Sequence, residues 1–156
     1  MIRFVLASLW LAFVLFLGSA PFAAQETGRF ILPVLQLAMP GTSAGQLQAI
    51  HMVIRKLAHI TEYAVLALLW FKAFDLAGRS ARTAAWAALS ICLACAFADE
   101  VHQSTLPTRQ GSARDFVLDA FGATAMLVVA RGAHNAPGRG ARRRDAVAAE
   151  PAEPAD

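Results

Sequence analysis

Three apolar stretches of this sequence each carry ionisable side chains near one end. The first carries Lys56, His59 and Tyr63, which follow one another at intervals of three and four residues and therefore share one face of a helix. Arg55 and Glu62 flank that face. The lysine and the arginine could hold a phosphate or carboxylate group, and a histidine beside carboxylates could transfer a proton near neutral pH.

The second stretch ends in Asp99, Glu100, His102 and Gln103. Residues three apart in a helix are neighbours on one face, so we expect Glu100 to face with Gln103 and Asp99 with His102. Carboxylates and a histidine at the end of an apolar helix could act in acid and base chemistry or hold a polar ligand. Arg109, in the connection that follows, supplies a further cation for an anionic group.

The third stretch begins after Ser112, which precedes Asp115 by three residues. This spacing is typical of a capping box and predicts a helix that starts near residue 113. Asp115, Asp119 and Gly122 then follow at helical spacing on one face. Gly122 has no side chain, so a neighbouring helix can approach closely beside the two carboxylates. We therefore predict that three helix ends direct ionisable groups into one small volume.

The composition indicates what kind of protein positions these groups. Of the 156 residues, 57% are hydrophobic and 16% are charged, with a mean hydropathy of +0.49. Soluble domains carry about a quarter charged residues, so the chain is expected to be a small membrane protein. Basic and aromatic residues do not alternate as nucleic-acid binding requires, and no nucleic-acid partner is expected. Cys92 and Cys95 lie within an apolar run, where we expect packing residues rather than a disulfide framework.

Four stretches are candidates for the helices that cross the bilayer, since each crossing takes about 20 mostly apolar residues. They are residues 4–21, 57–74, 81–101 and 113–133. The first could instead be a cleaved signal peptide, but Pro21 and Phe22 fit a small-residue cleavage site poorly, so we expect an uncleaved span. The predicted fold is all-α: a four-span transmembrane helical bundle that forms one domain over residues 1–133.

The connection between the first two spans contains the apolar run 30–39, which Pro33 interrupts. This run is too short to span, and we predict a segment that lies at the membrane surface. Ser43, with Gln46 three residues on, predicts the start of the second helix before it enters the bilayer. His51 in the first turns of that helix is expected at the surface.

Positive charges are divided unevenly between the two sides of such a bundle. With four spans, nine Lys and Arg lie on the side of both termini and five on the other. The positive-inside rule then places both termini in the cytoplasm and the ionisable groups on the outer face. The excess disappears, at five against five, when positions after Arg131 are left out. Residues 134–156 have no periodic apolar residues and are expected to form a disordered cytoplasmic tail.

Energetics favour a shared location for these groups. An ionised side chain that faces lipid near the centre of the bilayer costs about 2.5–3.5 kcal/mol, so such groups should face the bundle and pair with one another. We expect His59, Glu62, Glu100 and Asp119 to lie below the membrane interface.

The order of these residues resembles the VanZ-like family of small bacterial membrane proteins. The motifs are Lys56-x-x-His59-x-x-x-Tyr63-x-x-Leu66, Asp99-Glu100-x-His102-Gln103 and Pro107-x-Arg109-x-Gly111-Ser112-x-x-Asp115-x-x-x-Asp119-x-x-Gly122. The resemblance covers about residues 4–129. Two positions depart from the family pattern, which usually has Asn in place of Asp119 and Gly in place of Met126.

The resemblance implies a multi-pass protein of the bacterial inner membrane that is linked to the cell envelope, without an agreed reaction. The member that gives the family its name is associated with low-level resistance to the glycopeptide teicoplanin.

Three functional hypotheses stay open at this point. The first is a pocket for the headgroup of a membrane lipid or lipid-linked envelope precursor, with ligand-binding residues Lys56, Tyr63, Gln103, Arg109, Asp115 and Asp119. The second is a membrane-embedded enzyme acting on a lipid-linked substrate, with His59 or Glu100 as general base. The third is a purely structural role, either as a partner of another membrane protein or as a network that only locks helix ends together. His59-x-x-Glu62 is not a metal-binding signature, so neither a metal nor another cofactor is expected.

Overall fold

The computed structural model describes residues 1–105 and 112–136. Its elements are α1 (Ile2–Leu17), the 3-10 turn η1 (Ala20–Phe22), α2 (Ala24–Ala38), α3 (Ala44–Asp75), α4 (Ala81–Ser104) and α5 (Ala113–Asn135). No strand occurs in the described ranges, and the all-α prediction is confirmed. Arg109 and most of the predicted tail lie outside the described residues.

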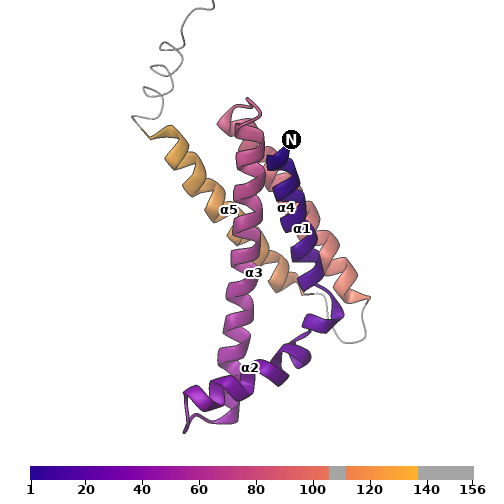
Figure 1. The fold of residues 1–156 in the computed structure, drawn as a ribbon, viewed down its shortest axis with the longest axis vertical. Helices are drawn as coiled ribbons and strands as arrows, with labels where there is room; N and C mark the ends of the chain where they lie inside the picture. The colour runs from indigo at the N-terminus through magenta and orange to yellow at the C-terminus, as the bar shows by residue number, and fades with distance from the viewer. Residues whose placement is uncertain (106–111, 137–156) are drawn as a thin grey trace, which may run out of the picture.

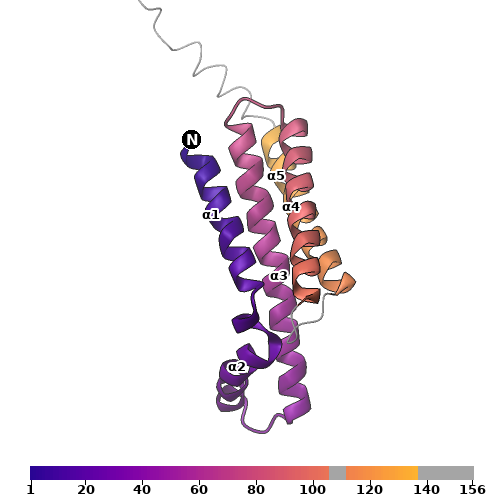
Figure 2. The ribbon, with the colours of Figure 1, turned by 90° about the vertical axis from the view of Figure 1, so that its right-hand side faces the viewer.

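The central element is α3, which contacts each of the other four α-helices (Figures 1 and 2). It begins with the predicted capping box, in which the Ser43 hydroxyl accepts from the Gln46 amide and the Gln46 side chain accepts from the Ser43 amide. With 32 residues, α3 is about 48 Å long and exceeds the bilayer core of about 30 Å. The helix is therefore longer than an upright crossing requires.

Helices α1 and α4 run in the opposite direction to α3 and α5 (Figure 1). The N-terminus, the turn after α3 and the end of α5 consequently lie at one end of the bundle. Contacts fasten that end: the Arg3 guanidinium donates to the Leu76 carbonyl, and His134 Nε2 lies 3.1 Å from Asp75 Oδ1. At the other end, α2 folds back along the first half of α3 (Figure 2).

Small residues allow the helices of the bundle to pack closely. Alanines from α3, α4 and α5 are fully buried around larger core side chains such as Leu66 and Phe71. Two backbones approach closely at Gly122 of α5, as predicted: a Cβ there would overlap the Ile60 carbonyl oxygen and lie 3.0 Å from Ile60 Cα. This contact holds α5 against the middle of α3.

Three helices, α3, α4 and α5, are long and apolar enough to cross a membrane. The first predicted span corresponds to α1, whose 16 residues are shorter than the roughly 20 that a crossing takes. Together with η1 and α2, which bend away by 68°, α1 forms either a broken fourth span or a re-entrant loop. The described residues thus give three candidate spans, or four if this bent pair counts as one.

Two local expectations differ from the structure. Pro33 does not interrupt the connecting segment but lies inside α2, a helix of 15 residues. His51 is not at the surface: it is fully buried, because α2 covers this part of α3 and brings Gly28 against the imidazole ring. A glycine at this position lets the ring pack directly against the α2 backbone.

Candidate functional site

A cavity of about 170 Å³ lies where the ends of α1 and α4 meet the middle of α3. Its walls combine apolar side chains with ionisable ones: Val14, Leu17, Gly18, Phe22, Thr27, Ile31, Ile54, Arg55, Ala58, His59, Glu62 and Asp99. The predicted polar segments of α3 and α4 both contribute to this lining, whereas the start of α5 does not. The apolar part comes largely from α1, η1 and α2, which the sequence alone did not place here.

Arg55 connects α3 to the segment that follows α1. Its Nη1 donates to the Phe22 carbonyl at 2.9 Å and to Thr27 Oγ1 at 3.1 Å. Thr27 Oγ1 also lies 3.2 Å from His51 Nε2, so one threonine joins two side chains of α3. These bonds fix the guanidinium at the wall of the cavity and hold α2 beside it.

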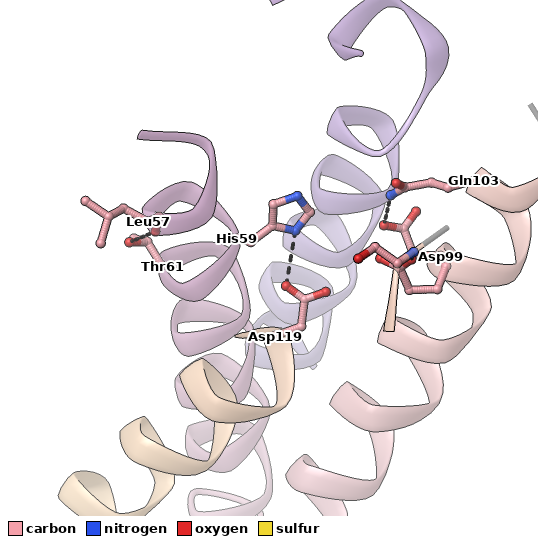
Figure 3. Close-up of polar contacts among 8 residues, drawn as sticks. Leu57, His59, Thr61, Asp99, Gln103 and Asp119 are labelled. Carbon is pink, nitrogen blue, oxygen red and sulfur yellow. Dashed lines mark hydrogen bonds and ion pairs between the residues drawn. The ribbon is translucent and has the colours of Figure 1, made fainter. Parts of the chain in front are cut away.

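His59 and Asp119 form a buried pair between α3 and α5. His59 Nδ1 lies 3.1 Å from Asp119 Oδ1, as Figure 3 shows. A carboxylate can only accept, so the ring donates through Nδ1 and its Nε2 is the nitrogen left for a ligand. Asp119 is fully buried, and its Oδ2 has no hydrogen-bond partner among the described residues.

Asp99 lies at the boundary between α4 and the end of α1. Its Oδ2 accepts from Gln103 Nε2 at 2.6 Å (Figure 3). A Cβ at Gly18 would overlap the Asp99 carboxylate, so the absence of a side chain on α1 makes room for this acid. Glu100 and Gln103 are both buried, as residues on one helix face would be, but the hydrogen bond of Gln103 goes to Asp99, one turn before it. His102, expected beside Asp99, is exposed.

Glu100 connects α4 to the start of α5 instead. Its carboxylate accepts from the Ser112 backbone amide, while the Ser112 hydroxyl accepts from the Arg114 amide at 3.2 Å. The predicted helix start is confirmed, but the partner in the reciprocal bond is Glu100 and not Asp115. A tertiary contact therefore replaces half of the capping box. Glu100 Oε1 is buried without a partner among the described residues.

The remaining predicted residues are not all at the cavity. Tyr63 is buried one turn further along α3, and its hydroxyl has no partner in the described ranges. Asp115 is half-buried and lies near enough to act electrostatically on His59 and Arg55. Lys56 is exposed and does not line the cavity. Arg109 is outside the described residues.

Several cavity residues were absent from the predicted ligand set. Three of them are the ionisable residues Arg55, Glu62 and Asp99. Their helical spacing from the predicted site residues could have placed them in the ligand set. Thr27 and Gly18 carried no signal, since neither belongs to a motif and both reach the cavity only because the chain turns back after α1. Fold topology, not spacing, brings them there.

The arrangement can do two kinds of chemistry. Arg55 can donate to a phosphate or carboxylate, while Glu62 and Asp99 can accept from an ammonium or hydroxyl group. His59, oriented by Asp119, can accept or donate a proton at the cavity wall. Among the described residues, no cluster of three or more His, Cys, Asp or Glu is placed to hold a metal ion.

Comparisons with known proteins place the chain in a family. No curated protein and no solved structure matches it. A family model described as VanZ/LLP1 matches residues 4–134, which include every described residue of the cavity and the buried pair. The match covers most of the chain and agrees with the resemblance carried by the motifs on α3, α4 and α5, so the chain belongs to the VanZ/LLP1 family.

Proposed function

We propose that this protein is a four-span protein of the bacterial inner membrane whose cavity binds the headgroup of an envelope lipid or a lipid-linked precursor. In this arrangement α1 and the bend after it form the first span, and α2 lies at the outer membrane surface. Both termini are cytoplasmic, and the cavity faces outward. The family membership and the three apolar helices support a membrane location.

The position of the cavity along α3 supports this assignment. From Lys72 back to Arg55 the helix spans about 25 Å, close to the thickness of the hydrocarbon core. If Lys72 lies at the cytoplasmic interface, Arg55 lies at the outer one, and His59 and Glu62 lie one to two turns below it. Lipid headgroups lie at that level, beside the acyl chains that the apolar walls would contact.

The distribution of cations supports the orientation. Arg3, Lys72, Arg79, Arg82 and Arg131 belong to the end of the bundle opposite the cavity, and four more arginines, at 139 and 142–144, follow α5 in the sequence, against five Lys and Arg elsewhere in the chain. Positive residues are enriched on the cytoplasmic side of membrane proteins. Alkaline phosphatase is active only outside the cytoplasm, so we expect a fusion after Pro107 to be active and a fusion after Gly132 to be inactive. The reverse result would overturn the orientation.

The observation that carries the binding proposal is the mixed lining of the cavity. A fixed guanidinium and two carboxylates border the same space as Leu17, Phe22, Ile31 and Ile54. A volume of about 170 Å³ is below the roughly 300–1,000 Å³ of sites for drug-sized ligands, which suits a headgroup whose acyl chains remain in the bilayer.

Native mass spectrometry of the purified protein tests this function. We expect a retained phospholipid or lipid-linked precursor, and we expect Arg55→Gln to reduce its occupancy at least tenfold. Lys56→Gln is the matched control, because it removes the neighbouring positive charge from an exposed residue outside the cavity. Equal retention by the wild type and Arg55→Gln, or an equal loss with Lys56→Gln, would contradict binding in the cavity.

A second candidate function is acid and base catalysis on a lipid-linked substrate. The observation that favours it is the buried carboxylate on His59 Nδ1, which orients the ring as in other enzymes that use histidine as a base. Incubation with extracted envelope lipids should then convert one species, and His59→Gln should stop conversion while lipid is still retained. If the protein retains lipid but converts none, the binding function stands and the catalytic function is contradicted.

A purely structural network makes a different prediction. If the polar groups only lock helix ends, Arg55→Gln and His59→Gln should lower the unfolding temperature in detergent while no lipid is retained by any folded variant.

A role of the protein in the cell envelope would change susceptibility to a glycopeptide such as teicoplanin when the protein is overproduced, and cavity variants should lose that effect.

A further inference from the structure

The charges around the cavity restrict the kind of headgroup that fits. Of the described residues that line it, Arg55 carries a fixed positive charge, whereas Glu62 and Asp99 carry carboxyl groups. His59 is paired with Asp119, so its own charge is offset when it is protonated. Among the described lining residues, acidic groups therefore outnumber cations.

These charged groups also reach the cavity from different helices and helix turns. Arg55 is anchored on the side of η1 and α2 by the Phe22 carbonyl and Thr27 Oγ1. Glu62 lies seven residues further along α3, about 10 Å of helical rise from Arg55, on the same face. Asp99 approaches from α4, held by Gln103 beside Gly18. Arg55 and Glu62 are thus set apart along α3, and the Asp99 carboxylate comes from a second helix.

A purely anionic headgroup fits this arrangement poorly. A phosphate monoester bound at Arg55 would bring further negative charge near Glu62 and Asp99, where low local polarity strengthens repulsion. A headgroup that carries both a phosphate and an ammonium group can pair with both the cation and the acidic groups of the lining. The phosphate accepts from the guanidinium, and the ammonium donates its three hydrogens to carboxylate oxygens.

We propose that the cavity recognises a zwitterionic headgroup of the phosphoethanolamine type, with Arg55 at the phosphate and with Glu62 and Asp99 at the ammonium group. This inference rests on the proposed lipid-binding function and specifies its ligand. A primary ammonium is favoured over a trimethylammonium group, because the acidic groups can accept hydrogen bonds and the trimethylated nitrogen has none to donate.

Binding of defined short-chain lipids to the intact purified protein tests the proposal by native mass spectrometry. We expect phosphatidylethanolamine to bind at least tenfold more tightly than phosphatidylglycerol, phosphatidylcholine or N-acetylated phosphatidylethanolamine. The acetylated lipid is the sharpest probe, since it keeps the phosphate and the chains but loses the ammonium charge. Free O-phosphoethanolamine should bind at least tenfold more weakly than the lipid, because it leaves the apolar walls uncovered. Equal binding would overturn the assignment to a lipid.

Variants of the lining residues test which side chains cause the preference for a lipid with a free ammonium group. Glu62→Gln and Asp99→Asn should each bring the affinity for the native and the acetylated lipid close together, whereas Thr61→Val, an exposed change on the same helix turn, should leave the tenfold preference intact. Where a variant fails to fold, the acetylated lipid still decides the matter with the wild-type protein. Equal binding of the two lipids by the wild type would overturn the ammonium site while lipid binding itself stands. Failure of every lipid to bind would overturn both.

Discussion

Gly122 of α5 packs directly against the backbone carbonyl of Ile60 on α3, with no room for a side chain between the two helices. This contact lies one turn after Asp119 on α5 and next to His59 on α3, so it places the carboxylate within 3.1 Å of the imidazole ring. The polar pair at the cavity thus depends on a glycine that makes no polar contact itself.

Gly122→Ala should therefore destabilise the protein. In a helix, replacing Gly with Ala gains about 1 kcal/mol of intrinsic stability, but an overlap with backbone atoms costs about 1–3 kcal/mol. We expect a lower unfolding temperature in detergent and a longer, weaker hydrogen bond between His59 and Asp119. Gly132→Ala is the control: this glycine lies in α5 with open space beside it, and its substitution should be neutral or stabilising. Equal effects at the two positions would exclude the close helix contact.

The His59 and Asp119 pair should be sensitive to loss of one partner. Asp119→Ala leaves the partly buried imidazole without its acceptor, and losing one partner of a hydrogen bond in this way costs about 1–3 kcal/mol. Asp119→Asn keeps an oxygen that can accept from Nδ1 and should cost about 1 kcal/mol. Unfolding in detergent measures both. The pairing would be disproved if the two variants were equally stable.

Thr27 should determine how firmly α2 is held against α3. Thr27→Val keeps the shape of the side chain but removes the oxygen that receives Arg55 and lies beside His51. A loss of about 1–2 kcal/mol is expected, with faster hydrogen exchange across residues 24–38. Thr61→Val is the matched control, since the Thr61 hydroxyl donates only within its own helix, to Leu57 at 2.8 Å (Figure 3). Exchange at residues 24–38 should not change in that variant.

Gly18 should control the space available beside Asp99. Gly18 has a helical backbone conformation, so alanine is tolerated by the backbone, but its Cβ would overlap the Asp99 carboxylate. We expect Gly18→Ala to displace that carboxylate and to weaken lipid retention at least tenfold, as measured by native mass spectrometry. Gly45→Ala, which places a methyl group in open space at the start of α3, should retain lipid normally. Unchanged retention in Gly18→Ala would contradict the place of Asp99 in the site.

The sequence by itself determined the all-α fold class and the starts of two helices, α3 at its capping box and α5 near Ser112. It also determined the close helix contact at Gly122. These features follow from local hydrogen bonding, apolar length and side-chain size, which are properties of nearby residues. The ionisable motifs also identified the family, because their order and spacing can be read from the sequence without knowledge of the fold.

Tertiary structure decided which of those ionisable residues share a cavity. Gln103 bonds Asp99, and Glu100 bonds Ser112, because helix rotation and the approach of α5 select among partners that spacing leaves equivalent. His51 is buried and Arg55 is anchored only because α2 folds back onto α3 after the bend that follows α1. No local pattern fixes that return, since it depends on contacts between residues more than twenty positions apart.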